Sequence, residues 1–173
     1  MLTQPQLARL NEQIASEAFV SRYYLSIACW AEAQGLAGAA QFFRSHHESE
    51  ELHMHKMMDY VLETGGRVVV GPVEAPPAGF DSIIDALHAS LAQEQEVTTS
   101  FNEIVDAFLA EKDHSTVNFL QWFVAEQHEE ESLFRTLIAK AELIGNEPRG
   151  LFWLDRELAE AAQVESASNG TPA

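Results

Sequence analysis

Four glutamates are the first candidates for chemistry, because each lies at the centre of the apolar face of a long helical run. They are Glu17, Glu50, Glu94 and Glu130. On a helical wheel, aliphatic and aromatic side chains of the same run surround each of them. Each also lies near the midpoint of its run. Midpoints share one level in an antiparallel bundle, so the pattern predicts four carboxylates in one layer of the core.

Such a layer requires bound positive charge. A lone buried carboxylate is costly or takes up a proton, and four together also repel one another. No Lys or Arg falls on these faces to neutralise them. Two divalent cations would balance four carboxylates, and oxygen ligands suit such hard ions. We therefore expect a dinuclear metal centre. The alternative is that the glutamates sit at helix edges and reach water.

Two further side chains have the spacing of metal ligands. His53 follows Glu50 by three residues and Gln127 precedes Glu130 by three, so each lies one turn from a core glutamate on the same face. Glu-x-x-His beside core glutamates is the pattern of di-iron carboxylate bundles. Oxygen-rich ligation with one imidazole favours iron in a redox role over zinc, which prefers more nitrogen and sulfur.

Glycine and proline delimit the elements that must position these residues. Unbroken helical runs cover 5–34, 36–64, 81 or 82–112 and 115–144, and a shorter run covers 151–163. Two connections are short and join antiparallel neighbours, whereas about 16 residues after Gly65-Gly66 suffice to run the length of a bundle. Val68 to Val70 have no strand to pair with and are expected to be extended.

The predicted fold is all-α. It is an antiparallel four-helix bundle with a long crossover between helices 2 and 3 and a short fifth C-terminal helix. Residues 1–163 are expected to form a single domain, and residues 164–173 a disordered tail.

Composition limits the partners. The 173 residues include 27 acidic and 10 basic side chains, for a net charge of −17. This charge repels nucleic acid and anionic membranes and attracts cations. No apolar stretch is long enough to span a membrane. The single Cys29 excludes an internal disulfide, and a reduced, cytoplasmic setting is expected. No nucleic-acid or membrane partner is expected.

Three segments resemble the bacterial non-haem ferritins: LNEQIASE ending at Glu17, ESEELHMH with Glu50 and His53, and NFLQWFVAEQHEEE at 118–131. The resemblance covers about residues 5–160. It implies that 24 subunits form a hollow shell. It also implies that each subunit oxidises Fe²⁺ with O₂ or peroxide at a dinuclear ferroxidase centre, and that the shell stores ferric mineral.

The resemblance also implies a role for each site residue. Glu17, Glu50 and His53 would bind the first iron. Glu50 would bridge to the second iron, held by Glu94 and Glu130.

The same resemblance places three other side chains close to the centre. Gln127 would lie beside the second iron. Tyr24 matches a tyrosine next to the centre and Trp122 a neighbouring aromatic residue, each serving as an electron donor or in packing.

The chain departs from the family at a third iron site. Glu126, Glu129 and Glu130 match that site, but Ser49 replaces a glutamate, so the site is expected to be weaker or altered. Haem-binding bacterioferritins have methionine where this chain has Glu51, and Glu-x-x-His where it has Gln127-x-x-Glu130. No haem is therefore expected.

Apolar side chains outside the core predict contacts between copies. Phe19, Tyr23 and Trp30 form an aromatic stripe opposite Glu17, which we expect a partner subunit to cover; the crossover is the alternative cover. The fifth run is too apolar for a free tail and is expected at another interface. His46 and His47 are expected to be hydrogen-bonded core residues.

Two other functions fit the same helical class. One is a di-iron peroxidase of the rubrerythrin type, although one cysteine cannot form the Cys₄ domain that those proteins usually carry. The other is a non-catalytic helical interaction module with a metal-free acidic core.

Overall fold

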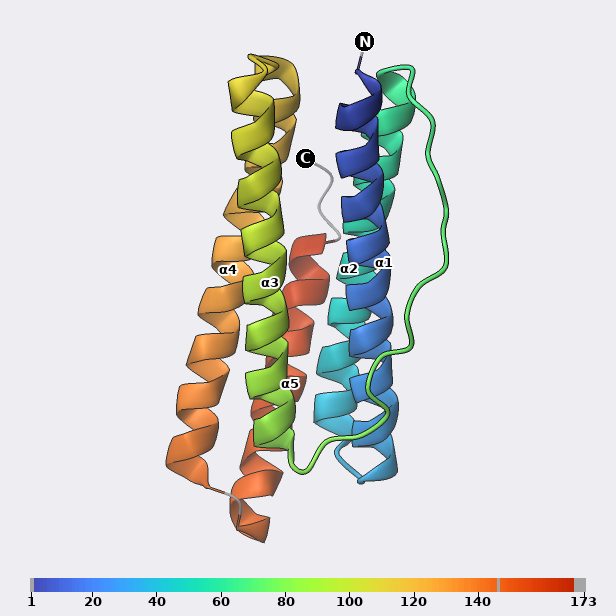
Figure 1. Ribbon diagram of the computed structural model, residues 1–173. Coiled ribbons are helices and arrows are strands. Elements are labelled where there is room, and N and C mark those ends of the chain that lie inside the picture. The colour runs from blue at the N-terminus through green and yellow to red at the C-terminus, as the bar shows by residue number, and fades with distance from the viewer. Residues whose placement is uncertain (1, 146, 170–173) are drawn as a thin grey trace.

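The computed structural model describes residues 2–145 and 147–169, and the regular structure in them is entirely α-helical (Figure 1). The five helices are α1 (Gln4–Ala33), α2 (Ala37–Glu63), α3 (Ile83–Ala110), α4 (His114–Ile144) and α5 (Pro148–Asn169). None of them combines the length and the apolarity needed to cross a bilayer. The predicted all-α class and five-helix order are confirmed.

Two antiparallel helix pairs form the bundle. Tight turns join α1 to α2 and α3 to α4, and the chain between the pairs runs along the outside of α1 from one end of the bundle to the other (Figure 1). The first turn depends on Gly35, whose φ of 78° lies in the left-handed region where a side chain is strained. The predicted long crossover between helices 2 and 3 is thus confirmed.

Side-chain caps define where the helices begin. Thr3 and Gln6 form a capping box on α1, and Ser82 accepts a hydrogen bond from the backbone N–H of Asp85 on α3. Asp113 caps α4 by accepting from the N–H of Thr116. The third helical run was expected to begin at 81 or 82 and α3 begins at Ile83, whereas α4 begins one residue before the expected Ser115.

The crossover is tied to α1 by side chains in place of a neighbouring strand. Asn11 Oδ1 accepts from the Val69 N–H at 2.6 Å, and Asn11 Nδ2 donates to the Arg67 carbonyl at 3.1 Å. Further along, Ser26 donates to the Pro77 carbonyl at 2.6 Å. Residues 68–70 therefore form an extended segment and not a strand, as the sequence predicted.

The aromatic stripe on α1 is covered largely by its own chain. The Phe80 ring, at the end of the crossover, packs edge-on against Tyr23 at 6.2 Å and Trp30 at 5.6 Å between ring centroids. Tyr23 is buried, and Phe19 is half-buried. The expectation that a partner subunit buries Tyr23 is wrong, because the crossover already does so.

Helix α5 packs against α2 and α4, with Leu154, Leu158 and Ala162 fully buried. It runs from Pro148 to Asn169, which is longer than the expected 151–163. Of the predicted tail, residues 164–169 belong to this helix and residues 170–173 lie outside the described residues. Much of the apolar fifth run is thus buried within its own subunit, and Phe152 and Trp153 remain exposed.

Two layers of aromatic rings on the face of α4 bracket the level of Glu130. Phe123 stacks on Phe101 at 4.9 Å on the N-terminal side of Glu130, and Phe134 stacks on Tyr24 at 6.0 Å on its C-terminal side. These rings are all fully buried. The two ring pairs hold the helices together above and below the level of Glu130 and leave that level to polar side chains.

Gly38 provides a test of the packing between α2 and α5. A Cβ atom there would lie 1.9 Å from the backbone oxygen of Asp155, a distance that only movement of α5 can relieve. We expect Gly38→Ala to lower the free energy of unfolding by about 1–3 kcal/mol, as overpacking does, despite the better helix propensity of alanine. Denaturant unfolding measures this change.

Gly71→Ala is the matched control, because a Cβ atom at Gly71 would meet nothing within 4 Å. That change should stay within about 0.5 kcal/mol of the wild type. Equal stability of the two variants would contradict the close packing of α5 on Gly38.

Candidate metal centre

Helices α1 to α4 each contribute one buried glutamate to the interior. The exposed fractions of Glu17, Glu50, Glu94 and Glu130 are 0%, 2%, 0% and 6%. Each of the four is close enough to another to shift its pKa. The interpretation that these glutamates lie at helix edges and reach water is therefore wrong.

Glu17, Glu50 and His53 form a group that could hold a cation. One ligand atom from each lies within 4.8 Å of the others. His53 Nδ1 is 3.2 Å from Glu50 Oε2 and 3.8 Å from Glu17 Oε2. Glu17 Oε2 is buried and has no hydrogen-bond partner among the described residues. An orphaned anionic oxygen facing an imidazole and a second carboxylate suits a divalent cation.

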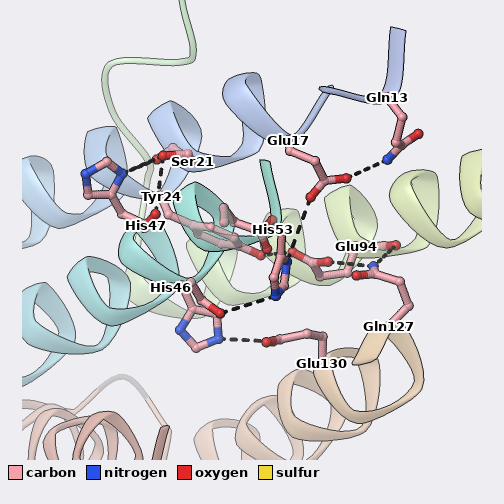
Figure 2. A network of polar contacts seen from close by, with 12 residues as sticks. Gln13, Glu17, Ser21, Tyr24, His46, His47, His53, Glu94, Gln127 and Glu130 are labelled. Atoms are coloured by element: carbon pink, nitrogen blue, oxygen red, sulfur yellow. Dashed lines mark hydrogen bonds and ion pairs between the residues drawn. The ribbon is translucent and has the colours of Figure 1, made fainter. Parts of the chain in front are cut away.

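Glu94 has protein donors on both carboxylate oxygens. Gln127 Nε2 donates to Glu94 Oε2 at 2.9 Å and to the Glu94 carbonyl at 3.2 Å, and Tyr24 donates its hydroxyl proton to Glu94 Oε1 (Figure 2). Burial and the charge of Glu94 raise the pKa of Tyr24, so its hydroxyl stays protonated. Gln127 and Tyr24 thus orient Glu94 from α4 and α1.

Glu130 is paired with a buried histidine. His46 Nε2 lies 3.1 Å from Glu130 Oε2, and His46 Nδ1 lies 3.1 Å from the Phe42 carbonyl (Figure 2). A carbonyl only accepts, so Nδ1 donates to it and a second proton lies between Nε2 and Glu130. This geometry favours an ion pair that provides positive charge inside the core.

Sequence reasoning gave His46 a hydrogen-bonded core role, which the structure shows, but missed its pairing with Glu130. The signal was its position four residues before Glu50 on the same helix face. His47, also expected in the core, is half-buried and hydrogen-bonds Ser21 at 2.7 Å. Gln13 was also missed, four residues before Glu17, and donates to Glu17 Oε1 at 2.5 Å.

Burial dominates the electrostatics of the centre. Burial, with repulsion between the glutamates, raises the pKa values of Glu17 and Glu50 well above normal and that of Glu94 to about 7. Burial also acts to raise the pKa of Glu130, but the charge and hydrogen bond of His46 outweigh it and lower that pKa. The metal-free centre therefore retains protons that an incoming cation must displace.

Glu126 and Glu129, which were matched to a third iron site, do not form a buried group like that of Glu17, Glu50 and His53. Burial raises the pKa of the half-buried Glu126, whereas Glu129 is exposed. Ser49 is buried, with its hydroxyl 3.5 Å from His53 Nε2. In the part of the chain that the structure describes, only Glu17, Glu50 and His53 form a group of three metal-ligating side chains of this kind.

Trp122 lies between the centre and the surface. Its ring centroid is 5.3 Å from that of His53, and the Lys56 ammonium lies 3.7 Å from the Trp122 ring centroid. The indole is 39% exposed and His53 only 3%, so Trp122 helps to cover His53.

The fold and the centre together define a ferritin-like subunit: two antiparallel helix pairs, a long outer crossover, and glutamates with a histidine that face inward. The Ferritin family of ferritin-like domains matches residues 7–144. The chain belongs to this family.

Bacterial relatives match over nearly their whole length. The bacterial non-heme ferritin of Campylobacter jejuni is 39% identical over 162 residues, covering 94% of this chain and 97% of the relative. That of Escherichia coli O157:H7 is 37% identical, covering 92% and 96%. Among solved structures, an open pore ferritin from the hyperthermophilic archaeon Archaeoglobus fulgidus matches with a TM-score of 0.90 and 39% identity, covering 92% of this chain and 98% of that one.

The raised pKa of Glu94 predicts a pH-dependent stability of the metal-free protein. A carboxyl whose folded pKa lies above its unfolded pKa stabilises the fold at low pH, and this contribution is lost as pH rises through about 7. With a chelator present, the wild type should lose more unfolding free energy between pH 5 and pH 8 than Glu94→Gln, whose amide does not titrate. Denaturant melts at both pH values measure the difference. Identical pH slopes would show that Glu94 is not the titrating group.

Proposed function

We propose that this chain oxidises Fe²⁺ to Fe³⁺ at a dinuclear centre and stores the ferric product inside a homo-oligomeric shell. Glu17, Glu50 and His53 would hold the first iron, and Glu94 and Glu130 the second, with Glu50 between them. Iron storage with ferroxidase activity is the function that membership of the ferritin family supports. The observation that carries it is the buried group of Glu17, Glu50 and His53, with its orphaned oxygen.

The residues suit this reaction because oxidation increases the charge of the bound ion. Two Fe²⁺ ions each lose one electron, and O₂ with two protons becomes hydrogen peroxide. With peroxide as oxidant, the same two electrons and two protons convert it to two water molecules. Anionic oxygen ligands favour the more highly charged Fe³⁺. Carboxylates on four helices hold both ions in reach of one oxidant.

Neighbouring side chains orient the ligands. Gln127 and Tyr24 both donate to Glu94, and Gln127 would thereby hold Glu94 toward the second iron. Tyr24 lies close enough to act also as an electron donor. Trp122, in ring contact with His53, would be a second donor nearer the surface.

We propose that Glu126 and Glu129 guide iron toward or away from the centre and form a weakened third site. Their negative charges lie on α4 within one turn of Glu130. Ser49 provides a hydroxyl where the family has a carboxylate, so the site has one anionic ligand fewer.

Exposed apolar side chains support assembly into an oligomer, and we propose 24 copies. Leu143, Val70 and Phe152 are 89%, 81% and 66% exposed, and Trp153 is 51% exposed. Exposed apolar surface of this kind is typical of contacts between subunits. Size-exclusion chromatography with light scattering should give a mass near 24 times 19.2 kDa. A monomer or dimer would contradict the shell.

Loss of Glu94 should slow the oxidation itself. On mixing Fe²⁺ with metal-free protein in air, Glu94→Ala should form Fe³⁺ at least about tenfold more slowly than the wild type, because the second iron loses an anionic ligand. The exposed Glu96, two residues further along α3, provides the control Glu96→Ala. Stopped-flow absorbance of Fe³⁺ measures the rates. Equal rates of Fe³⁺ formation in all three proteins would contradict the proposed ferroxidase function.

A further inference from the structure

The two oxygens of Glu17 have different environments. Oε1 accepts a hydrogen bond from Gln13 Nε2 at 2.5 Å, whereas Oε2 is buried, unpartnered among the described residues and 3.8 Å from His53 Nδ1 (Figure 2). Gln13 lies one turn before Glu17 on α1 and is 1% exposed. The carboxylate therefore presents one occupied and one free oxygen to the centre.

The amide of Gln13 is itself held from a different helix. Ser100, on α3, donates its hydroxyl proton to Gln13 Oε1 at 2.5 Å. This contact turns the NH₂ group of the amide toward Glu17. Once a cation has displaced the proton of Glu17, the reversed amide would place its oxygen against a carboxylate oxygen, which is repulsive. The two contacts together fix which end of Gln13 faces the metal ligand.

We propose that Gln13, held by Ser100, is a positioning residue that restricts Glu17 to binding a cation through one oxygen, Oε2. The inference rests on the proposed function, since it specifies how Glu17 binds the first iron. Binding through both oxygens would require the carboxylate to turn and Oε1 to leave the Gln13 amide. Binding through Oε2 alone leaves a coordination position that the second oxygen would otherwise fill.

Substitutions of Ser100 can test how Gln13 is held. It is half-buried and, with Gln13, lines a surface hollow of about 230 Å³ between α1 and α3. A change of its hydroxyl therefore alters the hold on Gln13 without opening the apolar core.

Zinc alone is a suitable probe, because its binding needs no redox step. In Gln13→Leu, which keeps the approximate volume and removes the donor, the affinity for Zn²⁺ at the Glu17 site should fall about tenfold, as for other partners of metal ligands. Calorimetry on the metal-free protein measures the affinity. A crystal structure of each zinc-loaded protein should show one bound oxygen of Glu17 in the wild type and two in Gln13→Leu.

Variants at Ser100 keep the proposal testable if Gln13→Leu does not fold. Ser100→Ala should weaken Zn²⁺ binding in the same direction but less, and Ser100→Thr, which keeps the hydroxyl, should restore it. Thr99→Ala is the matched control: it removes a neighbouring hydroxyl on α3 that bonds only the Gln95 carbonyl, at 2.8 Å. That variant should bind Zn²⁺ as the wild type does.

The outcomes separate this inference from the proposed function. If wild type binds Zn²⁺ through Glu17 and oxidises Fe²⁺, but Gln13→Leu or Ser100→Ala keeps wild-type affinity and one-oxygen binding, the positioning role is overturned and the ferroxidase function stands. If wild type binds no Zn²⁺ at Glu17, the positioning role is overturned, and the rate of Fe³⁺ formation decides the ferroxidase function separately.

Discussion

The structure depends on keeping four carboxylates in the dry middle of a helix bundle. Neutral donors and two buried imidazoles contact all four: Tyr24 and Gln127 bind Glu94, His46 binds Glu130, His53 lies 3.2 Å from Glu50 Oε2, and Gln13 binds one oxygen of Glu17. What remains is Glu17 Oε2, which has no hydrogen-bond partner in the part of the chain that the structure describes. Burying a carboxylate oxygen without a partner is costly, so a cation that binds at Glu17 Oε2 relieves the largest part of that cost.

The two sides of the centre differ in how many protein hydrogen bonds an incoming cation must replace. On the side of Glu17 and His53, Glu17 Oε2 has no hydrogen-bond partner among the described residues, so a cation displaces a proton but no protein donor at that atom. On the side of Glu94 and Glu130, each carboxylate is engaged by neighbouring side chains and must share or exchange those bonds. This difference comes from the side chains that hydrogen-bond the glutamates, since all four glutamates are buried.

Helical periodicity was enough to predict the glutamates, the helix order and the crossover, because these depend on which residues share one face of one helix. The contacts of His46 with Glu130 and of Ser100 with Gln13 were beyond it, because each joins two helices whose relative rotation and height no single run encodes. The cover of Tyr23 by Phe80 was misjudged for the same reason: the path of a long loop is decided by tertiary packing.

The crossover on the outside of α1 has a mechanical consequence. The covalent link between the two helix pairs runs over the surface, and α1 and α3 touch far less than the helices within each pair do. One pair carries Glu17, Glu50 and His53, and the other carries Glu94, Gln127 and Glu130. Iron bound between them would add a cross-link between the two helix pairs, so the filled subunit should resist their separation more strongly than the empty one.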